Sequence, residues 1–126
     1  MQTPLQLTFR GMARSDALAS HLERRAEKLE HLFHRVISCH VVVKLAGHHS
    51  RSGDRYEFSI NVGLPGHELL VTHEPPRDHS PESAYVSADR AFDEAERQLE
   101  DWVRRQRDHR RDVEPRAQEA GRETKA

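Results

Sequence analysis

Residues 56–73 have the sequence YEFSINVGLPGHELLVTH. In residues 56–64, large apolar side chains alternate strictly with polar or small ones, which is the period of a strand that buries one face. Pro65 and Gly66 then interrupt the alternation with a dipeptide typical of a turn, and residues 67–73 can form a second strand. The stretch therefore predicts an antiparallel β-hairpin with one apolar face.

Two further strands are expected before this hairpin. Residues 4–10 alternate Leu5, Leu7 and Phe9 with polar side chains, and residues 36–47 are rich in β-branched side chains. The apolar side chains of the second segment that share one strand face are Cys39, Val41, Val43 and Leu45. Both segments can therefore join the hairpin in one sheet.

Two amphipathic helices are expected to cover the apolar face of this sheet. The first begins after Ser15, a favoured N-cap residue, places Asp16 at the positive end of the helix dipole, and runs to about His34. The second has Ser-Pro-Glu at 80–82 as its N-cap and first turn, and continues to about Arg111. Their apolar stripes recur at helical spacing and are Leu18, Leu22, Ala26, Leu29 and Phe33 in the first helix, and Tyr85, Ala88, Phe92, Ala95, Leu99 and Trp102 in the second.

The order strand, helix, three strands, helix predicts an α+β fold. It is a two-layer β-α-β-β-β-α sandwich, with a four-stranded mixed sheet and two helices packed on one face. The first helix can form a right-handed crossover between parallel strands, and the later strands can form an antiparallel meander. We expect residues 1–111 to form the domain and residues 112–126 to form a disordered C-terminal tail, since residues 116–126 have no large apolar side chain.

The composition of the 126 residues favours a soluble, cytoplasmic protein. Hydrophobic residues make up 35% and charged residues 33%, and no apolar run approaches the ~20 residues that a transmembrane helix needs. The first ten residues lack the pattern of a signal peptide. Because Cys39 is the only cysteine, neither an intramolecular disulfide nor a cysteine-based zinc site can form.

No pattern in the sequence is typical of an enzyme. The ten histidines do not show the spacing of a zinc or iron site, and Cys39 lies on the apolar face of its predicted strand, where a thiol behaves as a small hydrophobe. A glycine-flanked nucleophile and a glycine-rich phosphate loop are both absent from the sequence. We therefore expect no catalysis, no metal, no cofactor and no small-molecule substrate.

Charge is segregated along the chain, although the net charge is only −1. Residues 1–46 carry seven Lys/Arg and four Asp/Glu, residues 76–100 carry three and seven, and residues 101–116 carry six and four. Two basic helices side by side can present a ridge that contacts phosphates, whereas an isolated basic helix is more often only a solvated, salt-bridged face. The predicted RNA-binding residues are Arg24, Arg25, Lys28, Arg97, Arg104, Arg105, Arg107, Arg110 and Arg111.

Short motifs in the same order add a family resemblance. They are Lys28-Leu29-Glu30, Val41-Val42-Val43-Lys44, Ala84-Tyr85 with Asp89, and Glu96-Arg97-Gln98-Leu99. With the predicted element order, residues 3–111 resemble the ribosome hibernation-promoting factor and ribosome-associated inhibitor family, also labelled sigma-factor modulation proteins. The chain is similar to the short form, without a C-terminal dimerising domain.

The resemblance implies a translation inhibitor that binds the small ribosomal subunit in the channel used by tRNA and mRNA. Members of this family contact ribosomal RNA through basic side chains on the two helices. By position, this role falls on Lys28 and Arg97, with Arg24, Arg25, Arg104, Arg105 and Arg107 as neighbours. We also expect the protein to be a monomer when it is off the ribosome.

Two alternatives remain at this point. This chain has Glu94 and Asp101 where family members commonly carry lysines, and acidic residues oppose phosphate binding. The protein can instead be a double-stranded RNA-binding module that acts off the ribosome, recognising shape more than bases. It can also be a protein-interaction module that uses the acidic helix face around Glu94, Glu96 and Glu100.

Overall fold

The computed structural model describes residues 1–49, 53–75 and 83–124, of which residues 47–49, 53 and 111–124 are described by their backbone alone. The elements follow the predicted order and are β1 (Gln6–Arg10), α1 (Asp16–Leu32), β2 (Ser38–His49), β3 (Gly53–Leu64), β4 (His67–His73) and α2 (Ala84–Thr124). The predicted β-α-β-β-β-α order and the α+β class are therefore confirmed.

The four strands form one mixed sheet in the order β1-β2-β3-β4. β1 pairs with β2 in parallel, with Leu7 opposite Val41, and α1 makes the crossover between these strands. β2, β3 and β4 form an antiparallel meander. At the β3–β4 turn Gly66 has a φ of +69°, a left-handed conformation that glycine adopts at little cost, and β4 has the predicted bounds.

Both helices begin at serine N-caps. The Ser15 hydroxyl accepts a hydrogen bond from the backbone N–H of Leu18 at 3.2 Å, as the sequence predicts. α2 begins later than expected: the Ser83 hydroxyl accepts from the backbone N–H of Val86 at 3.1 Å, so the cap is Ser83. The predicted N-cap and first turn at residues 80–82 lie outside the described residues.

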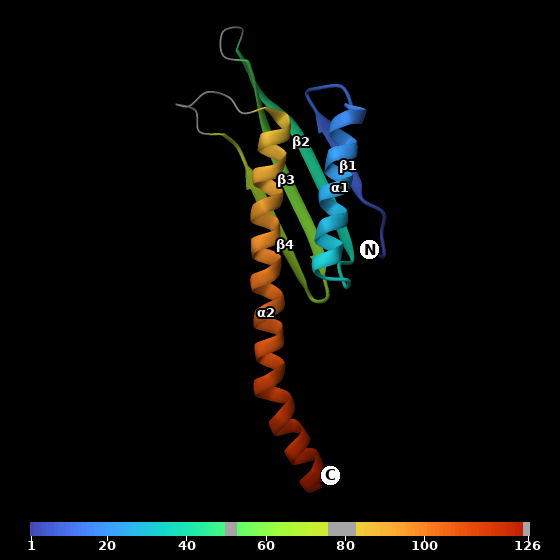
Figure 1. The fold of residues 1–126 in the computed structure, drawn as a ribbon, viewed down its shortest axis with the longest axis vertical. Helices are drawn as coiled ribbons and strands as arrows, with labels where there is room; N and C mark the ends of the chain where they lie inside the picture. Colours follow the sequence, from blue (N-terminus) through green and yellow to red (C-terminus); the bar gives the residue numbers. More distant parts are fainter. Residues whose placement is uncertain (50–52, 76–82, 125–126) are drawn as a thin grey trace.

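The core lies between the sheet and the two helices, which cover the same face of the sheet (Figure 1). Its largest fully buried side chains include Phe58 and Ile60 from β3, Phe92 from α2 and Leu22 from α1. Cys39 is buried among them, and burial raises the pKa of its thiol to about 12. The opposite face of the sheet is mainly polar, although Leu70 of β4 is exposed on it; on this face the Thr8 Oγ1 lies 2.9 Å from His40 Nε2.

α2 runs past the ends of α1 and of the sheet (Figure 1). Its backbone is helical to Thr124, whereas the sequence predicts disorder over 112–126. A helical segment without tertiary packing is only marginally stable in water, so the disorder of this segment in solution stays a prediction. No helix in the described ranges is both long and apolar enough to cross a membrane.

Candidate nucleic-acid interface

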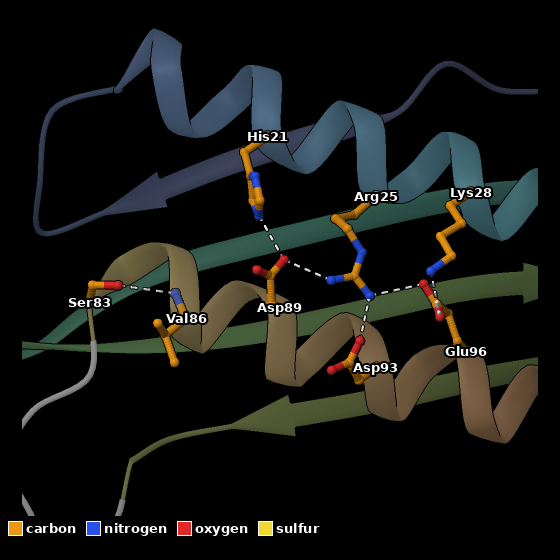
Figure 2. A network of polar contacts seen from close by, with 8 residues as sticks. All are labelled: His21, Arg25, Lys28, Ser83, Val86, Asp89, Asp93 and Glu96. Carbon is orange, nitrogen blue, oxygen red and sulfur yellow. Dashed lines mark hydrogen bonds and ion pairs between the residues drawn. The ribbon is translucent and has the colours of Figure 1, made fainter.

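A polar seam joins α1 to α2 (Figure 2). His21 Nε2 lies 2.7 Å from Asp89 Oδ1, Arg25 bonds Asp93, and Lys28 Nζ lies 3.5 Å from Glu96 Oε1. Basic side chains thus come from α1 and carboxylates from α2, in one row along two helices that run in the same direction. This interhelix seam neutralises part of the acidic charge of residues 76–100 inside the domain.

Arg25 is the centre of this seam. Its guanidinium donates hydrogen bonds to Asp89 at 2.7 Å, to Asp93 at 2.8 Å and to Glu96 at 2.9 Å, and it lies over the Phe92 ring. Its side chain is only 15% exposed. Burial alone lowers the pKa of Arg25, but the hydrogen bonds to Asp93, Glu96 and Asp89 outweigh this effect and raise it. In this arrangement Arg25 docks one helix on the other.

The pairing that raises the pKa of Arg25 also lowers the pKa of a carboxylate in the seam. Burial alone raises the pKa of Asp89, but the hydrogen bonds from His21 and Arg25 outweigh it and hold that pKa below its ordinary value. Glu96 is only 13% exposed, because Arg25 and Lys28 both reach it. The acidic face proposed for a basic protein partner therefore offers little unpaired negative charge at Glu96.

Glu94 and Asp101, the two acids expected to oppose phosphate binding, are also paired. Glu94 accepts hydrogen bonds from Arg97 at 2.5 and 3.0 Å, which are the main reason why the pKa of Glu94 is lowered. Asp101 accepts from Arg97 at 3.4 Å and from Arg104. These pairs are exposed, and exposed ion pairs contribute only ~0–1 kcal/mol, so phosphates can displace the carboxylates from Arg97 and Arg104.

The remaining predicted cations are exposed. No ion pair joins Arg24 on α1, or Arg105, Arg107 and Arg110 on α2, to a side chain of residues 1–46, 54–75 or 83–110. Lys28 is 60% exposed despite its contact with Glu96. The side chain of Arg111 lies outside the described residues. Together with Arg104, the three α2 residues form what we name the arginine row: Arg104, Arg105, Arg107 and Arg110.

The arginine row lies on the half of α2 that leaves the domain (Figure 1). Arg104, Arg107 and Arg110 follow each other at a spacing of three residues, so they lie along one side of the helix. The structure therefore separates the predicted cations into two groups. Arg25 is built into the interhelix seam, whereas the arginine row, with Arg24, Lys28 and Arg97, can reach an external anion.

The chain matches the family model described as Sigma 54 modulation protein / S30EA ribosomal protein over residues 5–107. The chain belongs to this family. No curated protein matches it significantly. The S30EA model spans all four strands, α1 and the part of α2 up to residue 107, so it covers the seam and most of the arginine row.

The fold of this chain is shared by solved structures, among them the following two. The crystal structure of the Thermus thermophilus Protein Y N-terminal domain has 26% sequence identity and a TM-score of 0.60, over 77% of this chain and 94% of that one. A ribosomal subunit interface protein from Coxiella burnetii has 20% identity and a TM-score of 0.60, over 79% and 96%, and supports the fold alone. The family resemblance inferred from the sequence is thus confirmed.

Sequence reasoning missed the interhelix seam. Its signal is present, because His21, Arg25 and Lys28 have the same spacing as Asp89, Asp93 and Glu96. Matched spacing of opposite charges on two helices is what a parallel polar seam requires. Among the described residues, no three His, Cys, Asp or Glu side chains come together as a group that could hold a metal ion.

Proposed function

We propose that this protein binds the small ribosomal subunit through its arginine row and inhibits translation by occupying the channel used by tRNA and mRNA. Family membership and the similarity to the Protein Y N-terminal domain support a ribosomal partner. The observation that carries the proposal is the separation of charge. Four carboxylates of α2, those of Asp89, Asp93, Glu94 and Glu96, pair within the domain, while the arginine row is exposed.

The mechanism is occupation of a site, without chemistry. Guanidinium groups bind phosphate oxygens in a bidentate manner, so an exposed row on a helix can follow an RNA backbone without reading bases. The turns of α2 that carry the arginine row lie past the end of the sheet, so their side chains can reach RNA on the wall of a channel. We further propose that the protein acts in the cytoplasm as a monomer, and that it needs no cofactor.

The predicted cations contribute to binding in different ways. Lys28, Arg24 and Arg97 are exposed and can contact RNA beside the arginine row. Arg97 must break its ion pairs with Glu94 and Asp101 before it can bind a phosphate, which lowers its net contribution to RNA affinity. Arg25 supports binding indirectly, because it holds α1 and α2 in the relative position that the surface needs.

Co-sedimentation with purified small and large ribosomal subunits at two salt concentrations tests this proposal. The protein should sediment with the small subunit and be released by salt, because phosphate contacts release counterions. Replacing Arg104, Arg105 and Arg107 by Glu together should abolish co-sedimentation. A matched control replaces three exposed cations away from the row, Arg10, Arg14 and Lys44, by Glu, with the same change in net charge.

Two results would contradict the proposal. In one, the control variant loses co-sedimentation as fully as the row variant, so that net charge alone explains binding. In the other, a duplex RNA competes as effectively as the small subunit itself, which would favour a double-stranded RNA-binding module off the ribosome. Circular dichroism of both variants checks that the fold is retained.

A further inference from the structure

Two adjoining hollows lie beside α2 where it passes the end of α1. Their volumes are about 310 and 260 Å³, and Val103 and Arg107 line both of them. The two hollows adjoin at these residues, and we name them together the α2 groove. Its apolar lining consists of Leu32, Phe33, Pro65, Leu99, Trp102 and Val103.

The floor of the α2 groove is apolar and partly open to solvent. Leu32 is 40% exposed, and Phe33 and Val103 are half-buried. Trp102, at 8% exposed, is fixed between two rings: His67 stacks on it at 5.8 Å between ring centroids, and Phe33 meets it edge to face at 5.4 Å. The groove is thus a preformed apolar site whose indole has little free surface.

The rim of the α2 groove is strongly basic. Arg35, Arg107 and Arg110 line the first hollow, and Arg104 and Glu100 line the second. Arg104 is paired with Asp101, but the other three arginines form no ion pair with any side chain that the structure describes. Four arginines against one lining carboxylate favour an acidic occupant.

We propose that the α2 groove docks an acidic protein segment that places a large apolar side chain on Leu32 and Val103, with carboxylates on the flanking arginines. Arginine and aromatic residues around an apolar floor are the composition of protein interface cores. An RNA base fits less well. Bases bind proteins by stacking on open aromatic faces, and the Trp102 ring is covered by His67 and buried.

The docked segment would cover Arg107 and Arg110, which belong to the arginine row. If the row also binds ribosomal RNA, the acidic segment and the RNA exclude each other, and the partner releases the protein from the ribosome. This consequence rests on the proposed function, whereas docking itself does not. Binding is therefore tested on the isolated protein.

The probe is a short fluorescein-labelled peptide with glutamates on both sides of a Leu-Phe pair, and its matched control carries Ser-Ser in place of Leu-Phe. Fluorescence anisotropy should show at least tenfold tighter binding of the Leu-Phe peptide, a difference of about 1.4 kcal/mol. The emission of Trp102, the only tryptophan, should shift when the unlabelled peptide binds. Both Leu32→Ser and Arg107→Ala should weaken binding at least tenfold.

Two control variants match these in chemistry but lie off the groove. Leu70→Ser removes a 66% exposed leucine from β4, and Arg24→Ala removes an exposed arginine from α1; neither should change the affinity. Val103→Ser replaces Leu32→Ser if circular dichroism shows that the latter is unfolded. Equal binding of the two peptides, or unchanged binding by the Leu32 variant, would overturn the proposal. So would a single-stranded RNA whose affinity falls tenfold with Leu32→Ser, because the groove would then hold a base.

Discussion

Replacing Arg25 by methionine removes the centre of the interhelix seam while keeping a long apolar side chain over Phe92. Hydrogen bonds to charged groups contribute about 1.5–3 kcal/mol when buried, whereas exposed ion pairs contribute about 0–1 kcal/mol. Glu96 is only 13% exposed, so its hydrogen bond with Arg25 counts as a buried one. Asp89 and Asp93 are 43% and 70% exposed, so their bonds with Arg25 count as exposed ion pairs. We expect Arg25→Met to lower the free energy of unfolding by about 2–4 kcal/mol, where domains of this kind have a total of about 5–15 kcal/mol.

Urea denaturation followed by circular dichroism measures this loss. The exposed neighbour Arg24→Met is the matched control and should stay within about 0.5 kcal/mol of the wild type. In a double-mutant cycle, Arg25→Met with Glu96→Gln should cost less than the sum of the single variants, because both remove the same contact. A loss below about 0.5 kcal/mol for Arg25→Met, or strict additivity, would refute the structural role.

The same variant separates two roles of Arg25. At a temperature where Arg25→Met is folded, it should still co-sediment with small ribosomal subunits, because its guanidinium is engaged with Asp89, Asp93 and Glu96. Near-UV circular dichroism of the variant checks that α1 and α2 keep their packing. Loss of co-sedimentation by a variant with unchanged packing would show that Arg25 contacts RNA directly, as the sequence predicts.

Three further predictions concern stability and reactivity. Ser15→Ala should lower the free energy of unfolding by about 1 kcal/mol in urea denaturation, since it leaves the Leu18 N–H without its cap; an unchanged midpoint would contradict the capping role. The pKa values of Asp89 and Glu94 are lower in the folded than in the unfolded protein, so their contribution to stability is present above the ordinary carboxyl pKa and is lost as pH falls below about 4. Urea titrations from pH 7 to about pH 3 should show this fall, and a flat profile would contradict it. Cys39 should not react with a thiol reagent at neutral pH until the protein unfolds, because burial raises the pKa of its thiol to about 12; rapid reaction of the folded protein would contradict its burial.

The sheet and the order of its elements could be predicted because local signals agree with the fold. The alternation in residues 56–64 and the Pro65–Gly66 turn fix the face and register of one hairpin, and β4 has the predicted bounds. The start of α2 could not be predicted, because Ser80 and Ser83 are both good N-cap residues, and the choice between them depends on how the chain leaves the sheet.

Only part of the candidate site could be predicted from the sequence. Sequence position identifies exposed and buried faces of a helix, but not which charge on one helix meets which charge on another. Arg24 and Arg25 are adjacent in the sequence, yet one is exposed and the other bonds three carboxylates of α2. For the same reason the α2 groove could not be predicted, because it forms where α1, the β3–β4 turn and α2 meet.

Competition for isolated small ribosomal subunits tests the central proposal most directly. Fluorescently labelled protein is bound to small subunits, and mRNA with its matching tRNA is then added while fluorescence anisotropy is followed. If the protein occupies the channel used by both RNAs, the added mRNA and tRNA should displace it, and excess protein should prevent their binding. Stable co-sedimentation of the protein, mRNA and tRNA on the same subunit would contradict this account.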